Sequence, residues 1–221
     1  MRLTLEDYLD AIEEEAARLA DAPVPVAAVA PGRASPLLEV LRRARTAIED
    51  ALDGLGLAGA ARTRRLELDT LADDFVRAAR DARAGEHAVA LARELAVALA
   101  LCRIDLELAE GEPGALGREL AIDAVAARLE SWRTGGPVAA ESLGGSIALV
   151  CADDPAAFLV EVTRHELRFR TRRGPADAVI VVPAARLFGL VYGRLVPREA
   201  EVTGSLVVAR AFACLAADGG S

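Results

Sequence analysis

The sequence predicts an α+β protein in which a helical bundle is followed by a smaller sheet-and-helix domain. Apolar residues recur at helical spacing through about the first 135 positions, whereas short apolar runs typical of strands follow. The Gly- and Pro-containing stretch "RTGGPVAAESLGGS" (133–146) separates the two patterns. We therefore expect a bundle over 1–137 and a second domain over 143–217.

The first half predicts four long helices and a shorter fifth one. Thr4 and Asp7 form a capping-box-like start, and Ser35 with Pro36 starts the next helix after the connector "APVPVAAVAPGRAS". The fourth segment is apolar nearly all round, and the apolar residues of the fifth are Leu120, Val125, Leu129 and Trp132. The expected helices span about 4–22, 36–52, 66–84, 86–110 and 118–133.

The second half predicts a sheet with two helices on one face. In "RHELRFRTRR" (164–173) the charges alternate, which predicts one solvated face with Leu167 and Phe169 inward, although a carboxylate-binding surface is an alternative. The expected strands span 146–152, 157–163, 165–171, 177–183 and 200–204, and the expected helices span 184–195 and 205–216.

Composition narrows the class of protein. The net charge of −8 disfavours nucleic acid as a partner, because phosphate binding requires a basic surface. No long uncharged apolar window predicts a membrane span, and the acidic N-terminus lacks the apolar region of a signal peptide, so we expect a cytoplasmic protein. The three cysteines are an odd number at wide spacing, which favours reduced thiols over disulfides.

Several strings, in the right order, resemble one known family. "CRIDLELAEGEP" resembles the "HRxDxELAxGEP" segment of the mycothiol-dependent maleylpyruvate isomerase family, whose N-terminal half is a DinB-like bundle. "APVPVAAVAPGR" resembles that family's "PVPxCPGW" connector, and "GRELAIDAVAARLESW" resembles its "ELAADGVDEFLE" helix. "GSIALVCADDPAAFLVEV", "ADAVIVVPAARLFGLVYGRL" and "AEVTGS" resemble its C-terminal, sterol-carrier-like domain. The resemblance covers nearly the whole chain.

The family implies a divalent metal, usually zinc, held by a second-helix histidine and a Glu-x-x-x-His pair on the fourth helix, with mycothiol at the open position. This sequence departs from the pattern at every ligand. The Glu and His of the pair become Ala98 and Cys102, and the second-helix histidine falls at Val40 or Leu41. The chain's two histidines do not replace them: His87 lies roughly 22 Å along the helix from Cys102, and His165 lies in the sheet domain. We therefore expect no metal site.

The fourth helix supplies two candidate catalytic residues, Cys102 and Asp105. Cys102 is a thiol nucleophile at the former metal position or, alternatively, a small buried hydrophobe. Asp105 is a polar anchor beside that position or the partner of a bundle arginine, for instance from 62–65. Glu94 shares its helix side with Asp105 but lies about 16 Å away along the axis, too far for a catalytic pair.

Two arginines are candidate cofactor-binding residues. Arg194 in "YGRL" matches an arginine of the family's "WGRL", which implies a grip on a carboxylate of a thiol cofactor or substrate. The alternative role of Arg194 is to complement a helix dipole. Arg103 points away from Glu94, which favours a solvated or interdomain position, and the acidic stretch 10–21 is interpreted as an exposed helix face.

Three functional hypotheses follow. The first is a metal-less relative of the family that binds a small molecule, a thiol adduct or a partner in an interdomain cleft. The second is an active thiol-dependent isomerase or transferase with a non-standard site around Cys102. The third is an interaction module, for example a homodimer, without catalysis.

Overall fold

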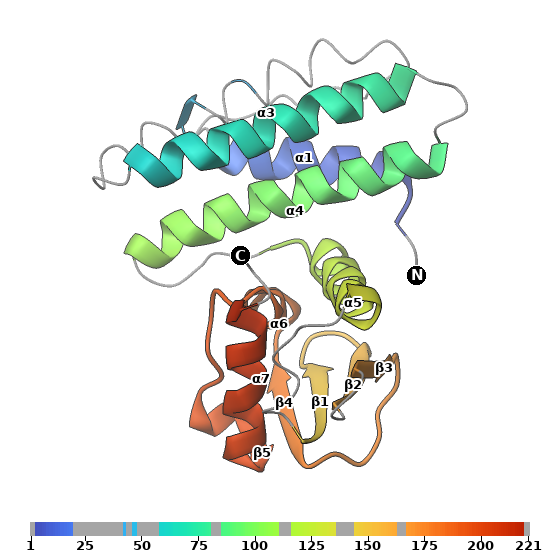
Figure 1. Cartoon of the computed structure of the whole chain (residues 1–221), viewed down its shortest axis with the longest axis vertical. Coiled ribbons are helices and arrows are strands. Elements are labelled where there is room, and N and C mark those ends of the chain that lie inside the picture. The colour runs from blue at the N-terminus through green and yellow to red at the C-terminus, as the bar shows by residue number, and fades with distance from the viewer. Residues whose placement is uncertain are drawn as a thin grey trace. The chain divides into compact units, whose positions relative to one another are not determined.

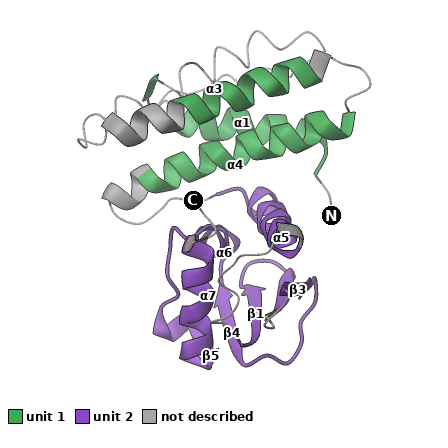
Figure 2. Ribbon diagram, in the orientation of Figure 1, with its two compact units in different colours: residues 1–114 green, residues 115–221 purple. Residues whose placement is uncertain are grey.

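The computed structural model describes residues 3–19, 42, 46–47, 58–80, 85–110, 116–135, 144–162 and 167–218, in two compact units (Figures 1 and 2). The first unit covers Met1–Gly114 and is helical where it is described, and the second covers Ala115–Ser221 and holds the sheet. The α+β class and the order of helical bundle then sheet-and-helix domain are thus confirmed. The division falls earlier than the expected 137–143, because α5 (Arg118–Gly135) packs on α6 (Ala184–Val191) and on β3 (Leu167–Arg170) in the second unit.

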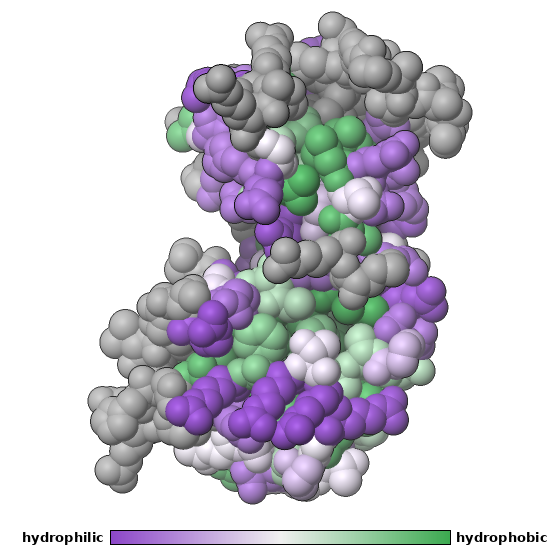
Figure 3. Space-filling model, turned by 90° about the vertical axis from the view of Figure 1, so that its right-hand side faces the viewer, coloured by the Kyte–Doolittle hydropathy of each residue, from purple (hydrophilic) through white to green (hydrophobic). Residues whose placement is uncertain are grey.

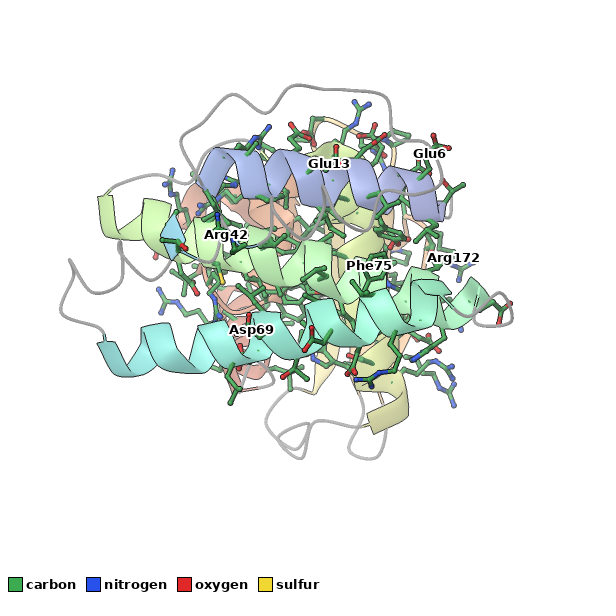
Figure 4. The ribbon with its side chains drawn as sticks, turned by 90° about the horizontal axis from the view of Figure 1, so that it is seen from above. Glu6, Glu13, Arg42, Asp69, Phe75 and Arg172 are labelled. Atoms are coloured by element: carbon green, nitrogen blue, oxygen red, sulfur yellow. The ribbon has the colours of Figure 1, made fainter. Side chains whose placement is uncertain are left out.

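The first unit is built around α4 (Gly85–Glu110), which packs on both α1 (Leu5–Leu19) and α3 (Ala58–Arg80). Figure 4 shows α4 between the other two, with Phe75 of α3 on the side that faces α4. The expected helix over 36–52 lies outside the described residues apart from 42, 46 and 47, which are helical. The packing of α4 on both α1 and α3 explains why α4 is apolar nearly all round.

The capping box predicted at the start of α1 is confirmed. The backbone N–H and the hydroxyl of Thr4 both donate to Asp7 Oδ2, at 2.6 and 2.7 Å, and the Asp7 N–H lies 3.3 Å from Thr4 Oγ1. These bonds satisfy donors that a helix start leaves open, and they lower the pKa of the Asp7 carboxyl.

The second unit contains a mixed five-stranded sheet in the order β3-β2-β1-β4-β5. Strands β1 and β4 are parallel and the other neighbours are antiparallel. The strands and the closing helix have the bounds β1 Gly145–Cys151, β2 Ala157–Val162, β4 Ala178–Val182, β5 Val202–Gly204 and α7 Leu206–Asp218, and the 3-10 turn Glu199–Glu201 precedes β5. Each predicted strand and helix of this half is present, with ends that differ by a few residues.

One face of the sheet is packed and the other is partly open. Ile147, Leu149 and Ile180 share the packed face and are fully buried, whereas Val181 on the opposite face is 46% exposed. Helix α7 contacts β1, β4 and β5, and α6 contacts β1 (Figure 1). The unit therefore has the sheet-and-helix arrangement that the alternating pattern predicted, with α5 as an additional helix.

A side-chain clamp joins the starts of β1 and β4. Asp177 Oδ2 accepts the backbone N–H of Ser146 at 2.7 Å and its hydroxyl at 2.8 Å, while the Asp177 carbonyl accepts the Ser205 N–H. The bonds from Ser146 lower the pKa of the Asp177 carboxyl below its usual 3.8.

We expect this clamp to make stability depend on acid pH. A carboxyl whose folded pKa is lowered stabilises the fold above its usual pKa of 3.8, and the effect disappears as pH falls through the folded value. The Asp177→Asn variant should therefore be less stable than the natural chain at pH 6, and the difference should shrink below pH about 4. Urea unfolding at several pH values measures this, and a difference that grows on acidification would contradict it.

Candidate functional site

The candidate residues of the first unit all lie on α4, and the structure buries two of them. Cys102 is 5% exposed and Arg103 is 3% exposed, whereas Asp105 is half-buried. Cys102 and Asp105 are three residues apart, so they neighbour each other on the helix surface. Glu94, by contrast, is exposed, which rules out a place for it in the core of the bundle.

Arg103 forms an ion pair with Glu15 of α1 inside the helical unit. Its Nε donates to Glu15 Oε2 at 2.7 Å, and the two side chains are 4% and 2% exposed. Arg18 lies at the edge of the pair, with its Nη1 3.6 Å from Glu15 Oε1. Burial raises the pKa of the Glu15 carboxyl above its usual 4.5, and the hydrogen bond from Arg103 opposes that effect.

This pair corrects two interpretations made from the sequence. Arg103 is not solvated, and the acidic stretch 10–21 is not uniformly exposed, because Glu15 is buried. A helical wheel of α4 alone could not reveal a partner on another helix. The signal that was present is in α1, where Glu15 follows Tyr8 and Ile12 by seven and three residues and so shares their buried side. Burial against Glu15 favours a structural role for Arg103 over ligand binding.

The donor set on α4 does not fit the zinc site that the family resemblance implies. Ala98 has no donor atom, so Cys102 is the one side chain left from the family's pair, and a structural or catalytic zinc ion needs three or four protein ligands. Val40 and Leu41, the sequence positions of the third ligand, are hydrocarbon and lie outside the described residues. In the part of the chain that the structure describes, no group of three His, Cys, Asp or Glu residues converges as a metal site would require.

The three thiols differ in exposure, which makes their reactivity predictable. Cys102 and Cys151 are buried and Cys214 is exposed. Burial, together with Asp153 and Asp154, raises the pKa of Cys151 to about 11.

We expect iodoacetamide at pH 7.5 to modify Cys214 first in the folded protein, as followed by peptide mass spectrometry. Faster modification of Cys102 would instead support its role as a nucleophile.

In the second unit, Arg194 is presented by a tight turn after α6. The N–H groups of Arg194 and Leu195 donate to the Gly189 carbonyl at 2.8 and 3.1 Å. Gly193 has φ +68°, and a Cβ there would lie 2.6 Å from Ala217 Cα of α7. Only glycine fits this position, so the backbone that carries Arg194 is held between α6 and α7.

Arg194 is close to a second arginine, Arg128 of α5. The Arg128 Cζ lies 5.4 Å from the ring centroid of Tyr192 and 5.7 Å from that of Trp132. Burial lowers the pKa of Arg128, and the positive charge of Arg194 adds to the effect. We call Arg128, Trp132, Tyr192 and Arg194 the arginine–aromatic cluster.

Neighbouring contacts hold this cluster in place. The Tyr192 hydroxyl donates to the Ala124 carbonyl of α5 at 3.2 Å, and the Tyr192 ring packs on Phe188 with centroids 4.6 Å apart. The Trp132 ring meets Phe212 of α7 edge to face at 6.0 Å. Helices α5, α6 and α7 thus each contribute to a single packed group that includes two guanidinium groups.

The sequence pointed to Arg194 but missed Arg128. The sequence signal that could have pointed to Arg128 is its four-residue spacing from Trp132, which puts both residues on the same side of α5. The remaining basic candidate is the strand around 167–170. As predicted, Leu167 is buried and Arg168 and Arg170 are exposed, whereas Phe169, which was also expected to face inward, is only partly buried. Figure 3, seen from the side on which β3 lies in Figure 1, shows a band of hydrophilic side chains across the second unit.

None of the helices in the described ranges combines the length and apolarity needed to cross a bilayer. Comparisons of the chain with protein-family models, with curated proteins and with solved structures find no match. The likeness to the mycothiol-dependent maleylpyruvate isomerase family therefore stays a prediction that is based on the sequence strings.

Proposed function

We propose that this protein is a metal-less, cytoplasmic relative of the mycothiol-dependent maleylpyruvate isomerase family. It binds a small carboxylate-bearing molecule or its thiol adduct, and Arg194 holds the carboxylate. The observation that carries this proposal is the backbone turn that holds Arg194 in the same unit as Arg128, near enough for its positive charge to lower the pKa of Arg128.

Two guanidinium groups whose charges interact repel each other, so an anion bound to both lowers the free energy of both. Guanidinium is suited to carboxylate because its N–H groups can donate two parallel hydrogen bonds. The turn at Gly193 fixes the Arg194 backbone before any ligand arrives, which reduces the entropy lost on binding. Next to Cys102 on α4, the guanidinium of Arg103 is already bonded to Glu15.

The experiment is isothermal titration calorimetry with maleate, fumarate and a thioether adduct of maleate, at constant ionic strength and without added metal. We expect saturable binding that Arg194→Gln weakens by about tenfold or more, which is the loss of one charge-assisted hydrogen-bond pair. Arg210→Gln is the matched control, because Arg210 is an exposed arginine of α7 with a long ion pair to Glu199. Equal affinity of the Arg194→Gln and natural proteins, or no binding of any of the three anions, would contradict the proposal.

A further inference from the structure

Two buried hydrogen-bond donors on α5 have no acceptor among the described residues. They are the Nε of Arg128 and the Nε1 of Trp132, neither of which has a hydrogen-bond partner among the described residues. Trp132 is 5% exposed, so water does not reach its indole N–H freely. Buried donors are almost always paired in folded proteins, and an orphaned one calls for an explanation.

The two donors belong to one place. Arg128 and Trp132 are four residues apart on α5, and the Arg128 guanidinium lies over the Trp132 ring. Both donors therefore lie within the reach of one small ligand that carries two acceptor atoms.

The charge of Arg128 has no counter-ion among the described residues. Arg128 forms no ion pair with any of them, and the nearby charge of Arg194 has the same sign. Arg128 and Trp132 thus offer donors and positive charge, and the group that these two side chains lack is an anionic acceptor.

We propose that Arg128 and Trp132 form part of an oxyanion-binding site, in which a two-oxygen group such as a carboxylate or phosphate accepts hydrogen bonds from Arg128 Nε and Trp132 Nε1. The assignment rests on the proposed function in so far as Arg194 would hold the same ligand. It adds two residues of α5 to the site and fixes the ligand as an oxyanion. It requires no metal and no covalent step.

The chain has a single tryptophan, so its fluorescence reports directly on this site. We expect titration with sodium maleate to change the Trp132 emission saturably, at an ionic strength held constant with sodium chloride. A parallel titration with sodium phosphate separates the two sources of the oxyanion. A response to maleate alone assigns a carboxylate ligand, and a stronger response to phosphate assigns a phosphate-bearing one.

Arg128→Met tests the guanidinium, because methionine keeps an apolar stem over the rings and removes the charge and the donors. Affinity should fall by about tenfold or more. Arg133→Met is the matched control on the same helix, since Arg133 is exposed and pairs with Glu130, and its affinity should be unchanged. Trp132→Phe keeps an aromatic ring without the N–H, and calorimetry should show binding weakened about fivefold.

The outcomes separate this inference from the proposed function. If Arg128→Met and Trp132→Phe bind the anion as tightly as the natural protein while Arg194→Gln does not, the site at α5 is wrong and the role of Arg194 stands. If Arg128→Met and Trp132→Phe lose binding and Arg194→Gln keeps it, the site at α5 stands and the proposed role of Arg194 is wrong. If neither anion changes the Trp132 emission or gives heat on titration, the oxyanion site is overturned.

Discussion

Replacing Glu15 by glutamine is expected to destabilise the helical unit by about 3–5 kcal/mol, because Arg103 would keep its charge in the core and lose the buried carboxylate of Glu15. Arg103 Nε of α4 and Glu15 Oε2 of α1 lie 2.7 Å apart, and both side chains are almost fully buried, so solvent does not screen the attraction between the two charges. Urea unfolding followed by far-ultraviolet circular dichroism measures the change.

A double-substitution cycle distinguishes the broken pair from a general loss of packing. Glu15→Leu alone and Arg103→Met alone should each be costly. The combination of these two substitutions should recover most of the loss, because apolar residues of similar volume replace a buried pair well. Arg77→Met is the control, since its ion pair with Asp74 is exposed and should contribute less than about 1 kcal/mol. Additive losses in the cycle would show that Glu15 and Arg103 do not depend on each other.

Gly193→Ala is expected to destabilise the second unit by about 3 kcal/mol. The added Cβ would lie 2.6 Å from Ala217 Cα and 2.8 Å from the Ala216 carbonyl oxygen, and the backbone has φ +68°. These neighbours are backbone atoms of α7, which cannot rotate away as a side chain would. Thermal unfolding followed by the emission of Trp132 measures the second unit selectively.

Gly117→Ala provides the comparison for Gly193→Ala. Gly117 lies in the same unit and has open space at its Cβ position, so alanine there should be neutral or slightly stabilising. The Gly193→Ala protein should also bind maleate more weakly, because the turn carries Arg194. Unchanged stability of Gly193→Ala would show that the turn adjusts without strain and does not fix Arg194.

Much of the fold could be predicted because local patterns determine it. The capping box at Thr4, the alternation in β3 and the change of period after the bundle each specify an element without reference to distant residues. The unit to which α5 belongs could not be predicted in this way. Its apolar residues fit a bundle as well as a sheet-and-helix domain, and only its packing on α6 and β3 assigns it to the second unit.

The candidate site was predicted less completely, for a related reason. Arg194 could be singled out because its string resembles a known one, but Arg128 comes from a helix some 66 residues earlier in the chain, and no local pattern links the two. The same holds for Glu15 and Arg103, which meet across 88 residues of sequence. Pairs of charged residues on different elements are set by tertiary packing, which a wheel of one helix does not contain.

We propose that the protein binds its anion through arginine and without a metal ion. The most direct test is calorimetric titration of maleate into chelator-treated protein, repeated after addition of one equivalent of zinc, with native mass spectrometry of the same samples. We expect equal affinity in both titrations and no retained zinc. Binding that appears only with zinc, together with one zinc ion held per chain, would contradict it.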